Sequence, residues 1–283
     1  MKIKSLITAS LLGLTNFTLA QTSHPLASTP DFSTYFKEKS ACFIVFNLDE
    51  NKLTTKYNPS RCEEKIPPDS TFKIALSLMA FDQKIINQNT VFKWDGQDRS
   101  LSFWNQDQTP KTWLKNSAVW VSQQLTPQLG LDKIKYYLEQ FDYGNQDFSG
   151  GPGKNNGLTH AWLSSSLKIS GNEQLVFLKK LIMNKLPVSK SAMTDTKENM
   201  YLETSPNDWK LYGKTGTGSP THQSINHTRA LEDGWFIGYV EKGKQTYLFV
   251  LNFSDSKPPN STEAGGTRAK KITKALLTKM NLF

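Results

Sequence analysis

Strand-like segments lie near both ends of this 283-residue chain, and segments with helical periodicity fill the region between them. Apolar runs at 42–48 and 53–57, and again at 235–240 and 246–253, form two pairs across short polar turns. Helical spacing of apolar residues is found at 74–81, 117–125, 131–141, 161–169, 173–186 and 266–280. The sequence therefore predicts an α+β fold: an antiparallel sheet flanked by terminal helices, with an inserted all-helical lobe.

The domain organisation follows from this pattern. We expect one body over residues 21–283, with a sheet lobe at about 21–80 and 210–283 and a helical lobe at about 81–209. A cleft between two lobes is a usual place for a small-molecule site. Residue 70 begins a helical run at this boundary, so we expect a site there.

The first 20 residues have the pattern of a signal peptide. Lys2 and Lys4 form a basic start, residues 6–14 are mostly apolar, and Thr18-Leu19-Ala20 is a small-residue cleavage site. A buried N-terminal helix is the alternative. No later apolar run is long enough to span a bilayer, so the sequence predicts an exported chain without a membrane anchor.

Cys42 and Cys62 are the only cysteines in the chain. In an exported protein they could form a single structural disulfide. Two buried free thiols are equally compatible with the sequence, because cysteine is often a small core residue in strands. Both possibilities stay open at this point.

The chain is basic, with 34 Lys and Arg against 25 Asp and Glu, a formal charge of +9. These charges are spread along the sequence, and the densest cluster, Lys270-Lys271-Ile272-Thr273-Lys274, has the pattern of a solvated helix face. Nucleic-acid binding favours a basic patch interleaved with aromatic residues. We therefore expect no nucleic-acid partner.

A serine followed three residues later by a lysine can form a nucleophile–base pair on one helical face. Ser70-Thr71-Phe72-Lys73 opens the apolar run at 74–81 directly after Pro67-Pro68-Asp69. The same spacing recurs at Ser165/Lys168 and Ser254/Lys257, so it is weak evidence alone. The first pair differs because three further motifs follow it in order: Ser117-Ala118-Val119, Tyr143-Gly144-Asn145 and Lys214-Thr215-Gly216.

Other common chemistries do not fit the sequence. It contains neither a Gly-x-Ser-x-Gly nucleophile turn nor a His-Glu-x-x-His or Cys/His cluster, so we expect no metal. Gly213-Lys214-Thr215 is similar to the end of a phosphate-binding loop, but Asp208 occupies the position of the required earlier glycine.

Together the motifs resemble the serine β-lactamase and penicillin-binding protein superfamily, and specifically the class D β-lactamases, or oxacillinases. The resemblance extends over essentially the whole mature chain, with residues 21–283 as the catalytic domain. Ser117-Ala118-Val119 in place of Ser-x-Asn, together with Tyr143-Gly144-Asn145, is typical of class D. Further matching segments are Trp162-Leu163, Ser165-Ser166-Leu167 and Gly234-Trp235-Phe236.

The resemblance implies that Ser70 is the nucleophile and that Lys73 is N-carboxylated by carbon dioxide, with no other cofactor. An apolar setting disfavours the ammonium form of Lys73, and a neutral amine can capture carbon dioxide. The Trp162 indole would donate a hydrogen bond to the carbamate. The alternatives are a salt-bridged helix lysine at 73 and an ordinary core aromatic residue at 162.

By the same resemblance, the backbone N–H groups of Ser70 and Thr217 form an oxyanion hole. Ser117 and Lys214 would relay a proton to the leaving nitrogen. Arg268 would bind the substrate carboxylate, with a surface helix residue as the alternative. Trp104 would line the cleft mouth or belong to the core. The implied substrate-binding set is Ser117, Val119, Lys214, Thr215, Gly216, Thr217, Arg268 and Trp104.

We therefore expect a periplasmic enzyme, a monomer or weak dimer, that hydrolyses penicillins of the oxacillin type and some cephalosporins and gives antibiotic resistance. One alternative is a penicillin-binding transpeptidase or carboxypeptidase. Another is a non-catalytic β-lactam sensor. The polar loop at 217–233, which flanks the site in relatives, makes the substrate range hard to predict.

Overall fold

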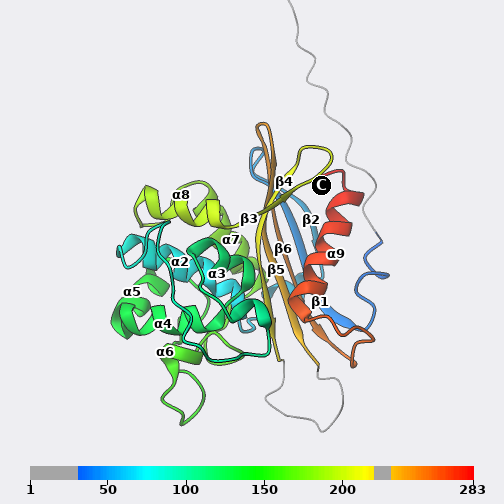
Figure 1. Cartoon of the computed structure of the whole chain (residues 1–283). Coiled ribbons are helices and arrows are strands. Elements are labelled where there is room, and N and C mark those ends of the chain that lie inside the picture. The colour runs from blue at the N-terminus through cyan, green and yellow to red at the C-terminus, as the bar shows by residue number, and fades with distance from the viewer. Residues whose placement is uncertain (1–30, 220–230) are drawn as a thin grey trace, which may run out of the picture.

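A computed structural model describes residues 31–219 and 231–283. The predicted signal peptide and most of the loop at 217–233 lie outside these residues. Within them, the chain forms one antiparallel sheet with helices on both faces (Figure 1). No helix in the described part of the chain is long and apolar enough to cross a membrane.

The sheet has six strands in the order β2-β1-β6-β5-β4-β3. Its two central strands, β5 and β6, come from the C-terminal part of the chain and pair with β4 and with β1, so the two ends of the sequence meet in one sheet. The strands are β1 (Lys39–Asn47), β2 (Lys52–Tyr57), β3 (Tyr201–Thr204), β4 (Lys210–Gly218), β5 (Asp233–Lys242) and β6 (Gln245–Asp255).

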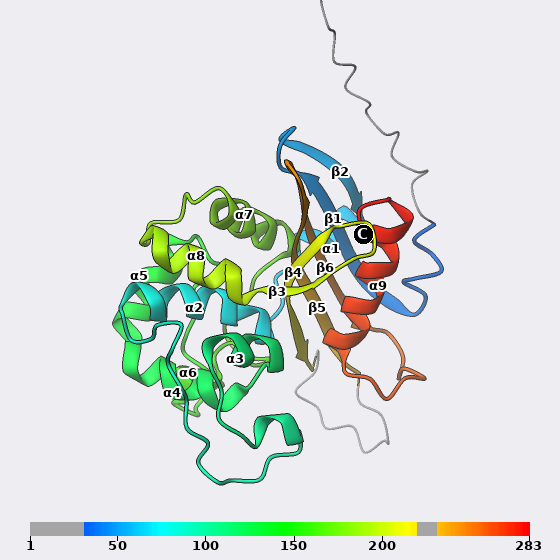
Figure 2. The same cartoon turned by 45° about the horizontal axis from the view of Figure 1, so that its top comes forward.

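The helices divide between the two faces of the sheet. The C-terminal helix α9 packs on β4, β5 and β6, while α2 to α8 form a separate group on the opposite side of the sheet (Figures 1 and 2). The helices are α1 (Pro59–Glu63), η1 (Asp69–Phe72), α2 (Lys73–Asp82), η2 (Ser102–Trp104), α3 (Pro110–Asn116), α4 (Val119–Leu129), α5 (Leu131–Gln140), α6 (Gly157–His160), α7 (Gly171–Ile182), α8 (Lys190–Asn199) and α9 (Gly265–Lys279).

Two hydrophobic cores lie on the two faces of the sheet because side chains alternate along each strand. On β5, Trp235 and Ile237 belong to the core shared with the helical group. Phe236 and Val240 belong to the second core, beneath α9. Burial of β5 on both faces explains why its sequence is almost continuously apolar.

The predicted helix at 161–169 is wrong. This segment is a series of turns after the short helix α6, and Ser164 has a left-handed backbone with φ 46°. Serine side chains compete with helix formation by bonding to nearby backbone groups. Ser166 is also held by a distant segment, since its Oγ donates to the Asp147 carbonyl and accepts from the Gly150 N–H.

The helix predicted at 117–125 begins at Val119, so Ser117 lies outside it, in the turn that ends α3. The sequence pattern also missed α3 and α8. Their boundaries depend on polar capping residues rather than on long apolar runs. Thr109 caps α3 and Ser189 caps α8, each by accepting a backbone N–H from the first turn.

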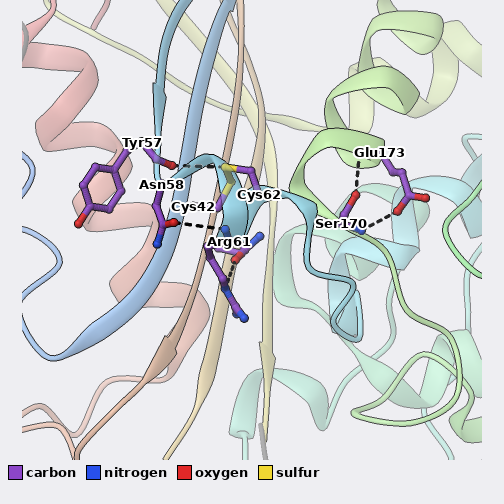
Figure 3. The surroundings of a disulfide bond; sticks show 8 residues. Cys42, Tyr57, Asn58, Arg61, Cys62, Ser170 and Glu173 are labelled. Atoms are coloured by element: carbon purple, nitrogen blue, oxygen red, sulfur yellow. Dashed lines mark hydrogen bonds between the residues drawn. A yellow bond between two sulfur atoms is a disulfide. The ribbon is translucent and has the colours of Figure 1, made fainter.

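Cys42 and Cys62 form a disulfide that joins β1 to α1 (Figure 3). Both cysteines are fully buried. The start of α7 packs closely against the bond: a Cβ on Gly171 would lie 2.7 Å from the Cys42 Sγ. The disulfide therefore ties β1, which lies between β2 and β6, to the segment that leads into η1.

We expect the double variant Cys42→Ala/Cys62→Ala to lower the free energy of unfolding by about 3 kcal/mol, because the crosslink restricts the unfolded chain. Urea unfolding monitored by tryptophan fluorescence would measure the change. Wild-type protein unfolded with a reductant present is the matched control and should lose the same amount. An unchanged free energy of unfolding in both samples would contradict the prediction.

Candidate active site

Ser70 and Lys73 lie together at the start of the helical group. The Lys73 Nζ donates a 3.0 Å hydrogen bond to the Ser70 Oγ. Ser70 is in η1 and Lys73 begins α2. Side chains three residues apart eclipse one another in a 3-10 helix, so this first turn aligns the serine and the lysine.

The Lys73 side chain is completely buried. Burial disfavours its charged form and lowers its pKa from 10.5 to about 7, and the nearby Asp69 carboxyl opposes this shift. A substantial fraction of Lys73 is therefore a neutral amine near neutral pH. A neutral amine can accept the proton of a serine hydroxyl, which an ammonium group cannot do.

Ser117 and Lys214 form a second serine–lysine pair. Ser117 has φ 56° in the turn between α3 and α4, and the Nζ of Lys214 on β4 donates to its Oγ. The same Nζ also donates to the Thr215 carbonyl at 2.9 Å and to the Thr215 Oγ1 at 3.3 Å. Burial, followed by the positive charge of Lys73, holds the pKa of Lys214 well below its usual value.

One edge of β4 is free of strand pairing toward its C-terminal end. The short strand β3 pairs only with Lys210–Tyr212, and η1 lies against the rest of β4. The Gly213 N–H points to this edge, where it donates to the Met200 carbonyl. Because N–H directions alternate along a strand, the Thr217 N–H points to the same side.

The 3-10 helix η1 approaches this free edge closely. A Cβ on Gly216 would lie 2.9 Å from the Pro68 carbonyl, so only glycine allows the present spacing. Ser70 lies in the first turn of η1, where backbone N–H groups have no acceptor within the helix. The Ser70 and Thr217 N–H groups therefore come from two elements in direct contact.

Trp162 is fully buried beside this turn. Its ring stacks on Phe72, with ring centroids 5.6 Å apart, and on Phe148 at 5.9 Å. The indole Nε1 has no hydrogen-bond partner anywhere in residues 31–219 and 231–283. Buried tryptophan N–H groups usually have an acceptor, so this donor is available to a group not made by the chain itself.

The sequence motifs did not single out Asp69 as a site residue, although it directly precedes Ser70. Its buried backbone is left-handed, with φ 47°. Its Oδ1 accepts hydrogen bonds from the Ser164 N–H at 2.9 Å and the Ser164 Oγ at 3.2 Å. Burial raises the pKa of the Asp69 carboxyl to about 8. An acid between a proline and the serine of the first motif was the available signal.

Arg268 does not join this group. Its guanidinium is buried in an ion pair with Asp255, with both nitrogens bonding at 2.8 and 2.7 Å, and it also bonds Glu232 at 3.0 Å. Its Nε donates to the Glu263 carbonyl. The donors of Arg268 are therefore largely committed to the end of β6 and to the residues just before β5 and α9.

Trp104 and Val119 lie beside Ser117. The Trp104 Nε1 donates a 2.8 Å hydrogen bond to the Asn116 carbonyl, and Val119 is the half-buried first residue of α4. A cavity of about 580 Å³ opens next to the site rather than over Ser70. It is lined by the 145–155 loop together with Pro67, Ser164 and Ser219.

Known proteins are similar to this chain over most of its length. The family model described as the penicillin binding protein transpeptidase domain matches residues 26–278. Beta-lactamase OXA-1 of Escherichia coli is 47% identical over 251 residues, which are 88% of this chain and 88% of that protein. The structure of the class D beta-lactamase BAT-2 has a TM-score of 0.77 and 33% identity, covering 90% of this chain and 98% of that one.

Regulatory protein BlaR1 of Bacillus licheniformis is 35% identical over 256 residues, which are 89% of this chain but 39% of that longer protein. The chain belongs to the class D β-lactamases, within the larger family of penicillin-binding protein transpeptidase domains. This agrees with the class that the sequence motifs predicted. Among the described residues, no group of three or more His, Cys, Asp or Glu side chains could hold a metal ion.

We expect Arg268→Ala to lower the free energy of unfolding by about 3 kcal/mol, because it leaves the buried Asp255 carboxylate without its partner. The KM for a penicillin should change little, since the guanidinium is bound elsewhere. Urea unfolding and steady-state kinetics would measure the two effects. A large rise in KM with unchanged stability would instead support the role of carboxylate ligand.

Proposed function

We propose that this chain hydrolyses penicillins of the oxacillin type and some cephalosporins through an ester on Ser70. The observation that carries this proposal is the 3.0 Å hydrogen bond between the Ser70 Oγ and a fully buried Lys73. Burial keeps the lysine partly neutral, and a neutral amine beside a serine hydroxyl activates that serine as a nucleophile.

In the first half of the reaction, the Ser70 Oγ forms a bond to the carbonyl carbon of the lactam ring while the basic group at position 73, the amine or its N-carboxylated form, accepts the hydroxyl proton and passes it on toward the Ser117–Lys214 pair. The N–H groups of Ser70 and Thr217 stabilise the negative oxygen that develops. The ring C–N bond then breaks, and the Ser117–Lys214 pair delivers a proton to the nitrogen. Lys214 and Thr215 would bind the substrate carboxylate, with Gly216 giving the strand room to approach.

Lys73 is further proposed to be N-carboxylated. The residues fit such a group: the Lys73 amine is buried, and the Trp162 Nε1 is a buried donor with no partner among the described residues. When formed, a carbamate supplies an anionic base both for the Ser70 hydroxyl and for the water that hydrolyses the ester. Trp162 would hold it by donating its indole N–H.

The main competing function is that of a penicillin sensor, which needs acylation of the serine but little deacylation. The relatives named regulatory protein BlaR1 and methicillin resistance mecR1 protein share 35% and 33% identity with this chain. The higher identity of 47% to beta-lactamase OXA-1 favours hydrolysis. The pattern of a signal peptide at residues 1–20 supports action in the periplasm, where hydrolysis would give antibiotic resistance.

Ser70→Ala should abolish both turnover of a chromogenic cephalosporin and covalent labelling by penicillin, because acyl transfer needs the hydroxyl itself. Intact-protein mass spectrometry and absorbance kinetics would measure the two effects. The Ser254/Lys257 pair has the same spacing but lies on and after β6, where the half-buried Ser254 hydroxyl bonds Arg61 and Asp233, so Ser254→Ala is a control that should keep both activities. A penicillin adduct on the Ser70→Ala protein would identify another nucleophile, whereas stable wild-type labelling without turnover would favour the sensor.

Turnover should fall as the pH drops through about 7, because protonation of Lys73 prevents carbamate formation. Degassing at about pH 5 should deepen the loss, and bicarbonate should restore activity. Lys73→Ala should be inactive with or without bicarbonate. Trp162→Phe keeps the ring packing but removes the N–H, so deacylation should slow roughly ten- to a hundredfold. Full turnover by degassed enzyme at low pH would show that hydrolysis depends neither on a carbamate nor on a deprotonated Lys73.

A further inference from the structure

Three segments that are distant in sequence meet at the Asp69 carboxyl. Asp69 itself begins η1, immediately before Ser70. Its Oδ1 accepts the N–H and the Oγ–H of Ser164, which lies two residues after Trp162. The Ser164 Oγ in turn accepts the Ser219 N–H at 2.9 Å, directly after the end of β4. A single buried acid thus connects the nucleophile, the tryptophan turn and the strand that carries Thr217.

The fit around this carboxyl is tight on the β4 side. A Cβ on Gly218 would lie 2.1 Å from the Asp69 Oδ2, so the carboxyl occupies the space that any other residue at 218 would need. The Oδ2 is buried and has no hydrogen-bond partner within the described part of the chain. Van der Waals contact with the glycine, rather than a second set of hydrogen bonds, therefore fixes this side of the carboxyl.

The backbone at this contact is unusual on both sides. Asp69 has φ 47° and Ser164 has φ 46°, and such conformations persist in non-glycine residues only where the surroundings enforce them. Asp tolerates the left-handed region better than most residues do. The structure thus maintains two left-handed residues facing each other across one hydrogen-bonded contact.

Two charged or titratable groups act on the Asp69 carboxyl: Lys73 from α2 and Asp233 from β5. Burial is the largest cause of its raised pKa of about 8, and Asp233 adds to that shift while Lys73 opposes it. The carboxyl is therefore mostly protonated at neutral pH. A carboxyl that is mostly protonated stabilises an ammonium at Lys73 less than a carboxylate would, and it does not repel an anion there.

We propose that Asp69 is a positioning residue, which holds the Trp162–Ser164 turn and the end of β4 in register with Ser70 and Lys73. This inference rests on the proposed function and adds to it a residue that does not touch the substrate. Asp69 would act through Trp162, by keeping its N–H aimed at the group on Lys73, and through Thr217, by fixing the end of its strand. Loss of the contact should therefore weaken deacylation most.

The test compares Asp69→Ala, Asp69→Asn and the control Asp208→Ala. Asp208 is an exposed aspartate that also has a left-handed backbone, with φ 64°. Alanine at position 208 therefore has a strained backbone, as alanine at position 69 does, but away from the site. Asn keeps the Oδ1 acceptor, is neutral like the protonated acid and tolerates the left-handed region. Two kinds of measurement are made. Kinetics gives the acylation and deacylation rates. NMR with isotope-labelled bicarbonate gives the bicarbonate concentration at which the carbamate signal is half-maximal.

In Asp69→Ala we expect deacylation to slow roughly ten- to a hundredfold, acylation to change less, and the half-maximal bicarbonate concentration to rise. Asp69→Asn should be close to wild type at neutral pH in all three measurements, and Asp208→Ala should be unchanged. If Asp69→Ala does not fold, Ser164→Gly removes the hydroxyl from the same contact without left-handed strain and should behave like Asp69→Ala.

The proposal is overturned if Asp69→Ala or Ser164→Gly matches Asp208→Ala in deacylation and carbamate signal, or if Asp69→Asn is as impaired as Asp69→Ala. These outcomes concern Asp69 alone, because they are measured against a wild-type enzyme that hydrolyses the substrate and gives a carbamate signal. A wild type that shows neither would instead refute the proposed function.

Discussion

The burial of Lys73 next to Ser70 is the constraint on which the rest of the site depends. An isolated ammonium group removed from water is costly, so the buried lysine loses its proton far more readily than an exposed one. Lys214 is buried nearby and disfavours a second positive charge. In the proposed reaction, water exclusion by the aromatic residues around Phe72 and Trp162 is therefore part of the chemistry, because it keeps a base ready beside the serine.

The fold supplies the two surfaces that this arrangement requires. The helical group delivers Ser70, Lys73 and Ser117, while the sheet delivers Lys214 and Thr217 on β4. Because β3 is short, the edge of β4 is left for η1 to pack against rather than for another strand. The candidate site therefore lies where the helical group meets the sheet.

The sequence predicted the features that depend on local pattern. Apolar runs predicted the strands β1, β2, β5 and β6, and the spacing of apolar residues predicted α9. Both predictions succeed because residues on a buried face are apolar and recur at the period of the strand or helix. The serine-rich turn at 161–169 was mistaken for a helix, since periodicity does not register side chains that bond to the backbone. The family resemblance identified the class of the protein from its motifs.

Contacts between distant residues could not be predicted in the same way. Nothing in the local sequence indicates that Asp69 meets Ser164, or that Arg268 pairs with Asp255 and Glu232. The choice between a disulfide and two free thiols likewise depends on how β1 and α1 are juxtaposed. In each case the partner is selected by tertiary packing, and the residue type alone leaves several partners possible.

The close approach of Gly218 to Asp69 also has an evolutionary consequence. A side chain at 218 would collide with the carboxyl at 69, whereas a smaller residue at 69 would vacate that volume. The two positions should therefore show epistasis: substitutions at 218 that are harmful beside aspartate become acceptable beside alanine. The residue types that are acceptable at position 218 would then depend on the residue at position 69. Among relatives, the two positions should therefore vary together rather than independently.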